Sequence, residues 1–212
     1  DLGHADLLIS RVTRADMDRF ALALAKYGYQ AGTTDLSDGN ETNYKVLAKI
    51  DWNIADNHSL MLRYNYTGNT QWYTPSAGST VGSRAASARI SENAYVFKNN
   101  CYTINDVAWS AVAELNSNLG ANRHNRLLFT ASDVSNKRDS KSGWFPHVDI
   151  WDGNGDAFMS AGYELFSNGT GNHVRTYNVS DHFRWSVGKS TVTAGMGYQY
   201  QRGRPNYRMF GT

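Results

Sequence analysis

The sequence predicts an all-β protein: a partial transmembrane antiparallel β-barrel of about six strands in three hairpins, with long extracellular loops and one short helix. Three observations predict it. Apolar and polar residues alternate with a period of two in three pairs of segments, tight turns join each pair, and long connections separate the pairs. Sandwiches distribute loops over both ends, whereas outer-membrane barrels have short turns at one end and long loops at the other.

Bulk composition is compatible with this fold and excludes several classes of protein. The chain has 212 residues, 41% of them hydrophobic and 13% aromatic, which excludes a disordered tail. Mean hydropathy of −0.55 and the lack of an apolar run near ~18 residues argue against a helical membrane protein. They do not exclude a membrane β-barrel, because every second residue of its strands is polar. Lys and Arg number 21 against 19 Asp and Glu, without a basic cluster, so no nucleic-acid partner is expected.

A short amphipathic helix is expected over residues 13–28. Thr13 is a suitable N-cap with Asp16 three residues later, and Gly28 is a suitable C-terminal stop. Its apolar stripe consists of Met17, Phe20, Leu24 and Ala25. We expect it to cap a loop rather than to bind a membrane surface or a partner.

The first hairpin, residues 44–66, has the clearest alternation. One parity of its first strand is apolar and includes Ile50, while the other is mostly charged and includes Lys49. Ala55–His58 forms the turn, and the pattern resumes on the return strand. In a soluble sandwich the apolar face would meet a second sheet, and in a membrane barrel it would meet lipid.

Two further hairpins follow, at residues 105–135 and 174–201. Their turns are expected at Asn118–Asn122 and at Gly188–Lys189. Asp181 interrupts the apolar parity of the third hairpin, where it marks either a bulge or a position turned to the polar face.

Aromatic residues occupy both ends of the strands on the apolar parity. Tyrosines such as Tyr44 and Tyr177 lie toward the long loops, and Trp52 and Trp185 lie toward the tight turns. Two membrane interfaces select amphipathic rings in this way. The alternative is a soluble β-sandwich binding module in which these rings form the core.

Residues 68–102 and 136–173 are expected to be extracellular loops. Asp152, Asn154 and Asp156 form a weak calcium candidate, because their side-chain oxygens could approach one ion, although an Asp/Gly turn explains the run better. The candidates for ligand contact are the loop aromatics Trp72, Tyr73, Trp144, Phe145 and Trp151, which could equally pack loop against loop.

The polar face of the strands carries the charged residues that should face the lumen of a barrel. They are Lys45, Lys49, Asp51, Arg63, Glu114 and Arg184. We favour solvated wall residues or wall ion pairs over contacts with a plug or a solute.

No enzymatic activity and no cofactor are expected. The histidines have no metal-binding spacing, and no nucleophile elbow, phosphate-binding loop or dinucleotide fingerprint occurs. Cys101 is the single cysteine, which excludes an internal disulfide.

Four stretches together resemble the barrel of TonB-dependent outer-membrane receptors of the Bacteroidetes type, in particular the Oar-like group. They are TRADMDRFALALAKYGYQAGT, KIDWNIADNHSLMLRYNYT, ISENAYVFKNN and WSVGKSTVTAGMGYQYQ, and the second is the most specific. The resemblance implies a full barrel of some 22 strands around an N-terminal plug, coupled to TonB by an N-terminal box. This sequence shows neither plug nor box, and strands for only part of such a barrel.

The chain is therefore expected to form part of a receptor that imports a ligand across the outer membrane of a Gram-negative bacterium. Its expected partners are outer-membrane lipid, the rest of the barrel and its plug, and the TonB complex, with a surface lipoprotein left open. The alternative membrane function is a barrel for assembly, adhesion or secretion. Asp1 and Gly211–Thr212 do not look like natural termini, and six strands leave two unpaired edges, so we expect a piece completed by further strands.

Overall fold

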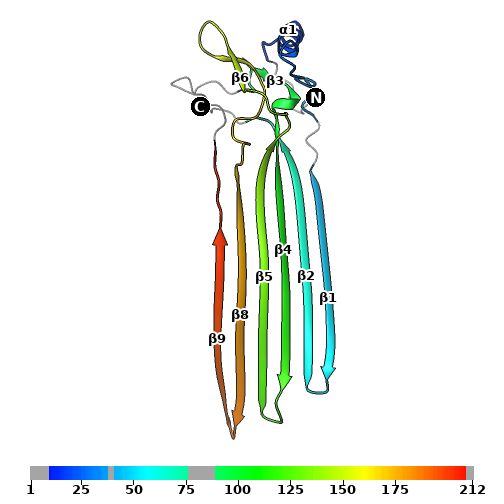
Figure 1. Cartoon of the computed structure of the whole chain (residues 1–212), viewed down its shortest axis with the longest axis vertical. Coiled ribbons are helices and arrows are strands. Elements are labelled where there is room, and N and C mark those ends of the chain that lie inside the picture. Colours follow the sequence, from blue (N-terminus) through cyan, green and yellow to red (C-terminus); the bar gives the residue numbers. More distant parts are fainter. Residues whose placement is uncertain (1–9, 38–40, 76–88, 209–212) are drawn as a thin grey trace.

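The computed structural model describes residues 10–37, 41–75 and 89–208, and these form two parts (Figure 1). The first is a tall six-stranded antiparallel sheet. The second, here called the cap, is a smaller assembly of one helix and short strands at the end of the sheet opposite its tight turns. The two parts are built on different principles.

The sheet has the strand order β1-β2-β4-β5-β8-β9, in which every neighbouring pair is antiparallel. The predicted fold class is confirmed, and the described strands form an open sheet. The six strands are β1 (Thr42–Ala55), β2 (His58–Tyr73), β4 (Tyr102–Asn118), β5 (Arg123–Ser140), β8 (Gly171–Val187) and β9 (Ser190–Gly203).

Each hairpin extends beyond the residues that the alternation marked. The first reaches Tyr73 rather than residue 66, and the second runs from Tyr102 to Ser140 rather than over 105–135. The third spans Gly171 to Gly203 rather than 174–201. The extra residues continue the backbone ladder but lose the apolar parity, so a hydrophobic pattern cannot reveal them.

Tight turns close the hairpins at the end away from the cap. Ala55 pairs with His58, and Val187 pairs with Ser190 around Gly188, whose φ of 58° lies in the left-handed region favoured by glycine. Adjacent turns also bind each other, since the Asn118 amide donates to the Asn57 carbonyl oxygen at 2.8 Å.

Asp181 is neither a bulge nor turned to the polar face. The register through it is continuous, and it pairs with Leu127 on one side and Met196 on the other. Directly paired residues share a face, so its carboxylate lies on the apolar face. There the Asn125 amide nitrogen donates to Asp181 Oδ1 at 2.8 Å, which partly satisfies the carboxylate locally.

The cap is assembled from the three segments that enter and link the hairpins. Its elements are α1 (Arg14–Ala25), β3 (Tyr95–Val96), the 3-10 turn η2 (Lys98–Asn100), β6 (Val148–Trp151) and β7 (Ala157–Ala161). The short strands form a second sheet in the order β3-β7-β6. The Gly/Ser/Ala-rich stretch 76–87 of the expected first loop lies outside the described residues.

A hydrophobic core holds the cap together. Helix α1 contributes Met17, Phe20 and Leu24, the segment before β4 contributes Phe97, and β7 contributes Met159. The helix begins with a full capping box, in which Thr13 and Asp16 satisfy each other's backbone amides. Among the described residues, Ala131 is the one buried apolar side chain in the six long strands.

Candidate functional site

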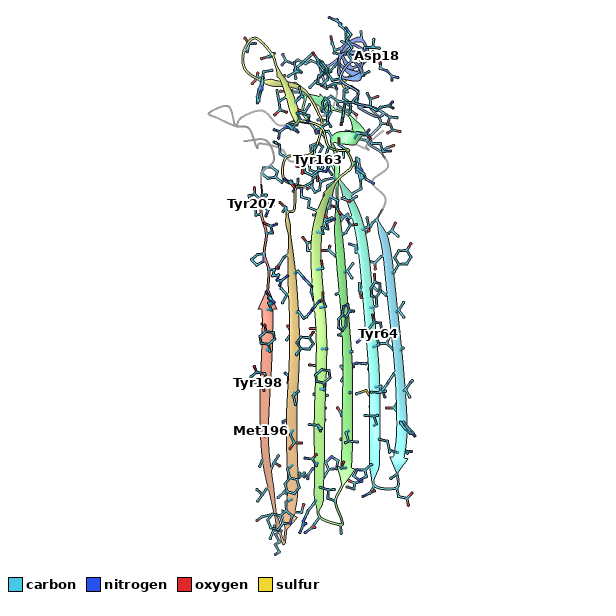
Figure 2. The ribbon with its side chains drawn as sticks, in the orientation of Figure 1. Asp18, Tyr64, Tyr163, Met196, Tyr198 and Tyr207 are labelled. Atoms are coloured by element: carbon cyan, nitrogen blue, oxygen red, sulfur yellow. The ribbon has the colours of Figure 1, made fainter. Side chains whose placement is uncertain are left out.

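The pairing registers divide the long strands into an apolar face and a polar face. The apolar face is the one that carries Ile50 and its cross-strand partner Leu62, and the polar face carries Lys49 and its partner Arg63. Figure 2 shows side chains along both faces of the sheet, with Tyr64, Met196 and Tyr198 labelled. Apolar side chains of β1, β8 and β9 are extensively exposed.

Two bands of aromatic side chains cross the apolar face. In β1 and in β8 the Tyr and Trp that mark these bands are separated by the same eight residues, Tyr44 to Trp52 and Tyr177 to Trp185. Both bands also shift together between the two strands. Through the paired residues of the strands between them, Tyr44 of β1 aligns with His173 of β8, and Trp52 aligns with Asp181. The aromatic residues of β8, Tyr177 and Trp185, each lie four residues closer to the tight turns than these aligned positions. The bands therefore run obliquely to the rows of paired residues.

All six charged residues predicted for the lumen lie together on the polar face. Three of them belong to two ion pairs of the wall: Lys49 Nζ lies 2.7 Å from Asp51 Oδ2, and Arg126 Nη2 lies 2.6 Å from Glu114 Oε2. In the part of the chain that the structure describes, Lys45, Arg63 and Arg184 form no ion pair. The polar face therefore carries both neutralised pairs and unneutralised cations.

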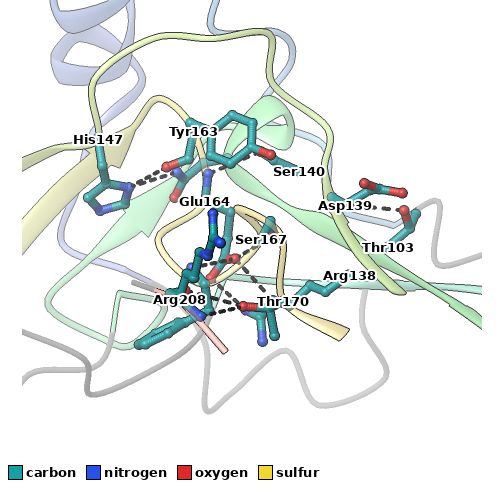
Figure 3. A network of polar contacts seen from close by, with 12 residues as sticks. Thr103, Arg138, Asp139, Ser140, His147, Tyr163, Glu164, Ser167, Thr170 and Arg208 are labelled. Carbon is teal, nitrogen blue, oxygen red and sulfur yellow. Dashed lines mark hydrogen bonds and ion pairs between the residues drawn. The ribbon is translucent and has the colours of Figure 1, made fainter. Parts of the chain in front are cut away.

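A buried ion pair ties the cap to the sheet (Figure 3). Glu164 is 1% exposed, and its carboxylate receives two hydrogen bonds from Arg138 of β5, at 2.5 and 3.0 Å. Oε2 also accepts from the Ser167 hydroxyl at 2.7 Å and from the Phe166 amide at 3.1 Å. The Arg138 guanidinium lies 3.4 Å above the centre of the Tyr102 ring, so its charge is stabilised on two sides.

A second carboxylate, Asp149, is largely buried and organises the small sheet of the cap. Arg89 binds both of its oxygens at 2.8 and 2.9 Å, and His147 Nε2 and the Ser160 hydroxyl lie 3.1 and 2.5 Å from Oδ1. Burial alone would raise the pKa of Asp149, but the hydrogen bonds from His147 and Arg89 hold it well below its usual range.

The five predicted aromatic contact residues occupy different environments. Trp72 and Tyr73 belong to the end of β2 rather than to a loop; Trp72 packs against the core around Cys101, and Tyr73 stacks on Tyr102 at 5.3 Å. Phe145 stacks on Tyr29 at 4.4 Å, and Trp151 is half-buried in β6. Trp144 differs, because it is 71% exposed while its ring stacks on Tyr163 at 4.9 Å.

The calcium candidate folds as an Asx-type turn. Asp152 Oδ1 accepts hydrogen bonds from the amides of Asn154 and Asp156, both at 2.9 Å, and Oδ2 lies 2.5 Å from Arg11 Nη2. These bonds, above all the one from Arg11, lower the pKa of Asp152 to about 2. Within the described ranges no cluster of three His, Cys, Asp or Glu side chains is arranged to hold a metal ion.

Sequence reasoning missed both buried ion pairs and one charged cluster on the strands. Asp133 of β5 accepts from His173 Nε2 at 2.7 Å and from Arg175 Nε at 2.8 Å. All three continue the parity of the apolar face, and His173 and Arg175 lie beyond Tyr177, the last aromatic residue of that parity in β8, so following the parity past Tyr177 would have found these two. Arg138 and Glu164 are far apart in sequence and follow no motif, and no local signal could have paired them.

Cys101 lies between η2 and β4 in the second small core of the cap, with Leu36 and Val96. Its burial raises the pKa of the thiol to about 12. The thiol is therefore protonated at neutral pH and chemically inert.

Comparison with known proteins places this geometry in context. A family model described as an outer membrane beta barrel domain matches residues 9–210, which is nearly the whole chain. No curated protein has a significant match to the sequence. Over the described residues, no helix is long and apolar enough to cross a membrane.

Proposed function

Because the chain belongs to the outer membrane beta barrel domain family, we propose that it forms part of the wall and the extracellular cap of a TonB-dependent receptor. The protein is a β-barrel protein of the outer membrane. We propose that its cargo is a ligand recognised at the cell surface and imported by the complete receptor. The residues described here would supply recognition and a wall, and no chemistry on the ligand.

The two aromatic bands support a membrane-spanning role for the six strands. Eight residues of strand rise about 27 Å, and a tilt of about 40° reduces this to roughly 20 Å. That height is close to the roughly 25 Å apolar band of outer-membrane barrels. The oblique course of the bands is what such a tilt requires, since the bands follow the membrane plane and the rows of paired residues do not. The apolar face then meets lipid, and the polar face meets the lumen.

The observation that carries the receptor proposal is the folded cap. Tight turns mark the periplasmic end of outer-membrane barrels, so the cap stands on the extracellular side. Its three segments share one core and two buried ion pairs, whereas a barrel that only sealed the membrane would need no such assembly. A rigid extracellular surface is what ligand recognition needs, because binding then costs little ordering of loops.

Within this proposal, Trp144 and Tyr163 are the preferred ligand contacts. Their stacked rings present an aromatic surface, and Tyr163 directly precedes Glu164 of the ion pair that ties the cap to the sheet. Rigid exposed aromatics are typical anchors of binding surfaces. A surface lipoprotein partner would dock on this same cap.

Binding of the full-length protein to the periplasmic C-terminal domain of TonB tests the proposal. We expect specific binding, together with low conductance in planar bilayers, because a plug fills the lumen of this receptor class. Absence of TonB binding with a large constant conductance would contradict it.

The second candidate is an outer-membrane barrel for assembly, adhesion or secretion. The exposed Trp144 surface also suits adhesion, since an adhesin needs a rigid extracellular contact surface. The same experiment separates the two, because an adhesin or assembly factor would not bind TonB.

A further inference from the structure

The apolar face changes character abruptly at the extracellular end of β8 and β9. Tyr177 and Tyr200, which are paired with each other, are the last aromatic residues of this face on these two strands. Two residues farther toward the cap, on the same face, stand Arg175 and Arg202, which are also directly paired. Like charges placed directly opposite each other destabilise a sheet, so this pair requires a compensating anion.

The next row places a third arginine opposite a histidine. The Arg204 amide donates to the His173 carbonyl oxygen at 2.8 Å, and the His173 amide donates back to the Arg204 carbonyl oxygen at 3.3 Å. Residues bonded in this reciprocal way lie opposite each other and share a face. Three arginines and one histidine therefore stand in two adjacent rows above the tyrosines.

The acidic group that this cluster contacts is Asp133. It receives hydrogen bonds from His173 and Arg175, while Arg202 and Arg204 form no ion pair or side-chain hydrogen bond in the described part of the chain. Both of these arginine side chains are exposed. The nearest further charges on this face, Lys137 and Asp139, neutralise each other at 2.7 Å. A net positive charge therefore remains on the cluster.

The depth of the cluster identifies what faces it. In a barrel wall the outer tyrosine band marks the boundary between acyl chains and headgroups, so residues just above it meet headgroups. Arginine binds phosphate through planar, paired N–H donors and loses less hydration than lysine on contact. Below the cluster, Val179 and Tyr198 continue the apolar surface on which acyl chains can lie.

We propose that Arg175, Arg202 and Arg204 form a binding site for the phosphorylated headgroup of a lipid in the outer leaflet. Asp133 orients Arg175 through its Nε atom. His173 binds the same carboxylate through Nε2. The lipid phosphate supplies the counter-charge that Arg202 and Arg204 lack, and the lipid becomes a fixed component of the barrel wall. This inference does not depend on what the receptor imports.

The test uses the full-length protein, purified in detergent and freed of lipid, with diphosphoryl lipid A as the probe and native mass spectrometry as the measurement. The variant is R202Q/R204Q, which removes two charges and leaves the Asp133–Arg175 pair intact. The matched control is R63Q/R184Q, which removes two arginines from the polar face of the same sheet. We expect binding to weaken roughly tenfold or more in the first variant, and to be unchanged in the control.

Three outcomes would overturn the proposal. Equal binding by the wild type and R202Q/R204Q would show that these arginines hold no lipid. Equal binding of dephosphorylated lipid A would show that the phosphates are not recognised. Competition by millimolar inorganic phosphate as effective as that by lipid A would assign the site to a free anion. Heat-modifiable gel migration verifies folding, and the single variant R202Q replaces the double variant if that one fails to fold.

Discussion

The sheet and the cap bury apolar groups in opposite ways. In the sheet, apolar residues such as Ile50 and Tyr198 are more than half exposed, and in the proposed barrel wall lipid would surround them. In the cap, residues such as Phe97 and Met159 are inside a shared core, as in a small water-soluble domain. The sheet is held mainly by its backbone ladder and the cap by long-range packing and buried ion pairs.

This difference determines how each region should respond to mutation. A lipid-exposed side chain can be shortened without leaving a void, because lipid refills the space. A core side chain in the cap cannot, because its neighbours are fixed. Charges follow the same division: ion pairs on the polar face are partly solvated, whereas those of the cap are buried and costly to break.

The largest effect is expected for Glu164→Ala. The substitution leaves the buried Arg138 guanidinium without its carboxylate, and breaking a buried pair in this way costs about 3–5 kcal/mol. Native-state hydrogen exchange over residues 141–170 should report the loss. On the sheet, Glu114→Ala is the matched control and should cost less than about 1 kcal/mol, because Arg126 is half exposed. Equal losses of stability in the two variants would contradict the proposed difference between the cap and the sheet.

A comparable loss is expected for Phe97→Ala. The ring is 2% exposed in the core of the cap, and removing such a ring costs about 3–5 kcal/mol. Phe129→Ala removes the same ring from the apolar face, where the side chain is 42% exposed, and should change stability little in detergent or lipid. The measurement is the protection of backbone amides against hydrogen exchange, in the cap for Phe97→Ala and in the strands for Phe129→Ala. A larger effect from Phe129 would indicate that a further protein layer covers the apolar face.

Acid should open the cap before the sheet. The pKa of Asp149 is lower in the folded protein than in the unfolded chain, so its contribution to stability is complete above about pH 4. The contribution is lost as the pH falls below that value toward the lower folded pKa. Protease susceptibility of the cap should therefore rise below about pH 4, while the strands keep their circular dichroism signal. Asp149→Asn should weaken this pH dependence, and the lowered pKa of Asp152 should account for part of what remains.

The smallest effect concerns Cys101. With the pKa of its thiol raised to about 12 and the side chain fully buried, it should resist maleimide for hours at pH 7.5. Denaturation of the cap should make it reactive, which peptide mapping by mass spectrometry can follow. Rapid labelling in the native protein would mean that the cap opens frequently.

Sequence patterns predicted the sheet well and the cap poorly, for a physical reason. Each strand has a period of two that one segment reveals by itself, so Ile50 and Lys49 could be assigned to opposite faces without knowledge of any partner. The shared polar face of Lys45 and Arg184 followed from the same rule. The cap depends on contacts between distant segments, and its short strands Tyr95–Val96 and Ala157–Ala161 are too brief to display a period.

The candidate sites show the same difference between what local sequence can predict and what depends on tertiary packing. Trp144 and Trp72 are equivalent in sequence terms, yet one is exposed and the other lies in a small core, because only tertiary packing distinguishes them. Asp152 was expected within a turn, and its bonds to the backbone show that turn. Arg175 was overlooked because the apolar pattern ends at Tyr177, although a charge placed directly beyond an aromatic band is itself a signal.

The most direct test of the central claim compares two neighbouring residues in the first hairpin. Spin labels are placed at Leu62→Cys and Arg63→Cys in the full-length protein reconstituted in lipid. Their collision rates with oxygen, which partitions into lipid, and with a water-soluble nickel chelate are then measured by electron paramagnetic resonance. The account predicts high oxygen and low nickel accessibility at position 62, and the reverse at position 63. Equal accessibility at both positions, or nickel accessibility at position 62, would contradict it.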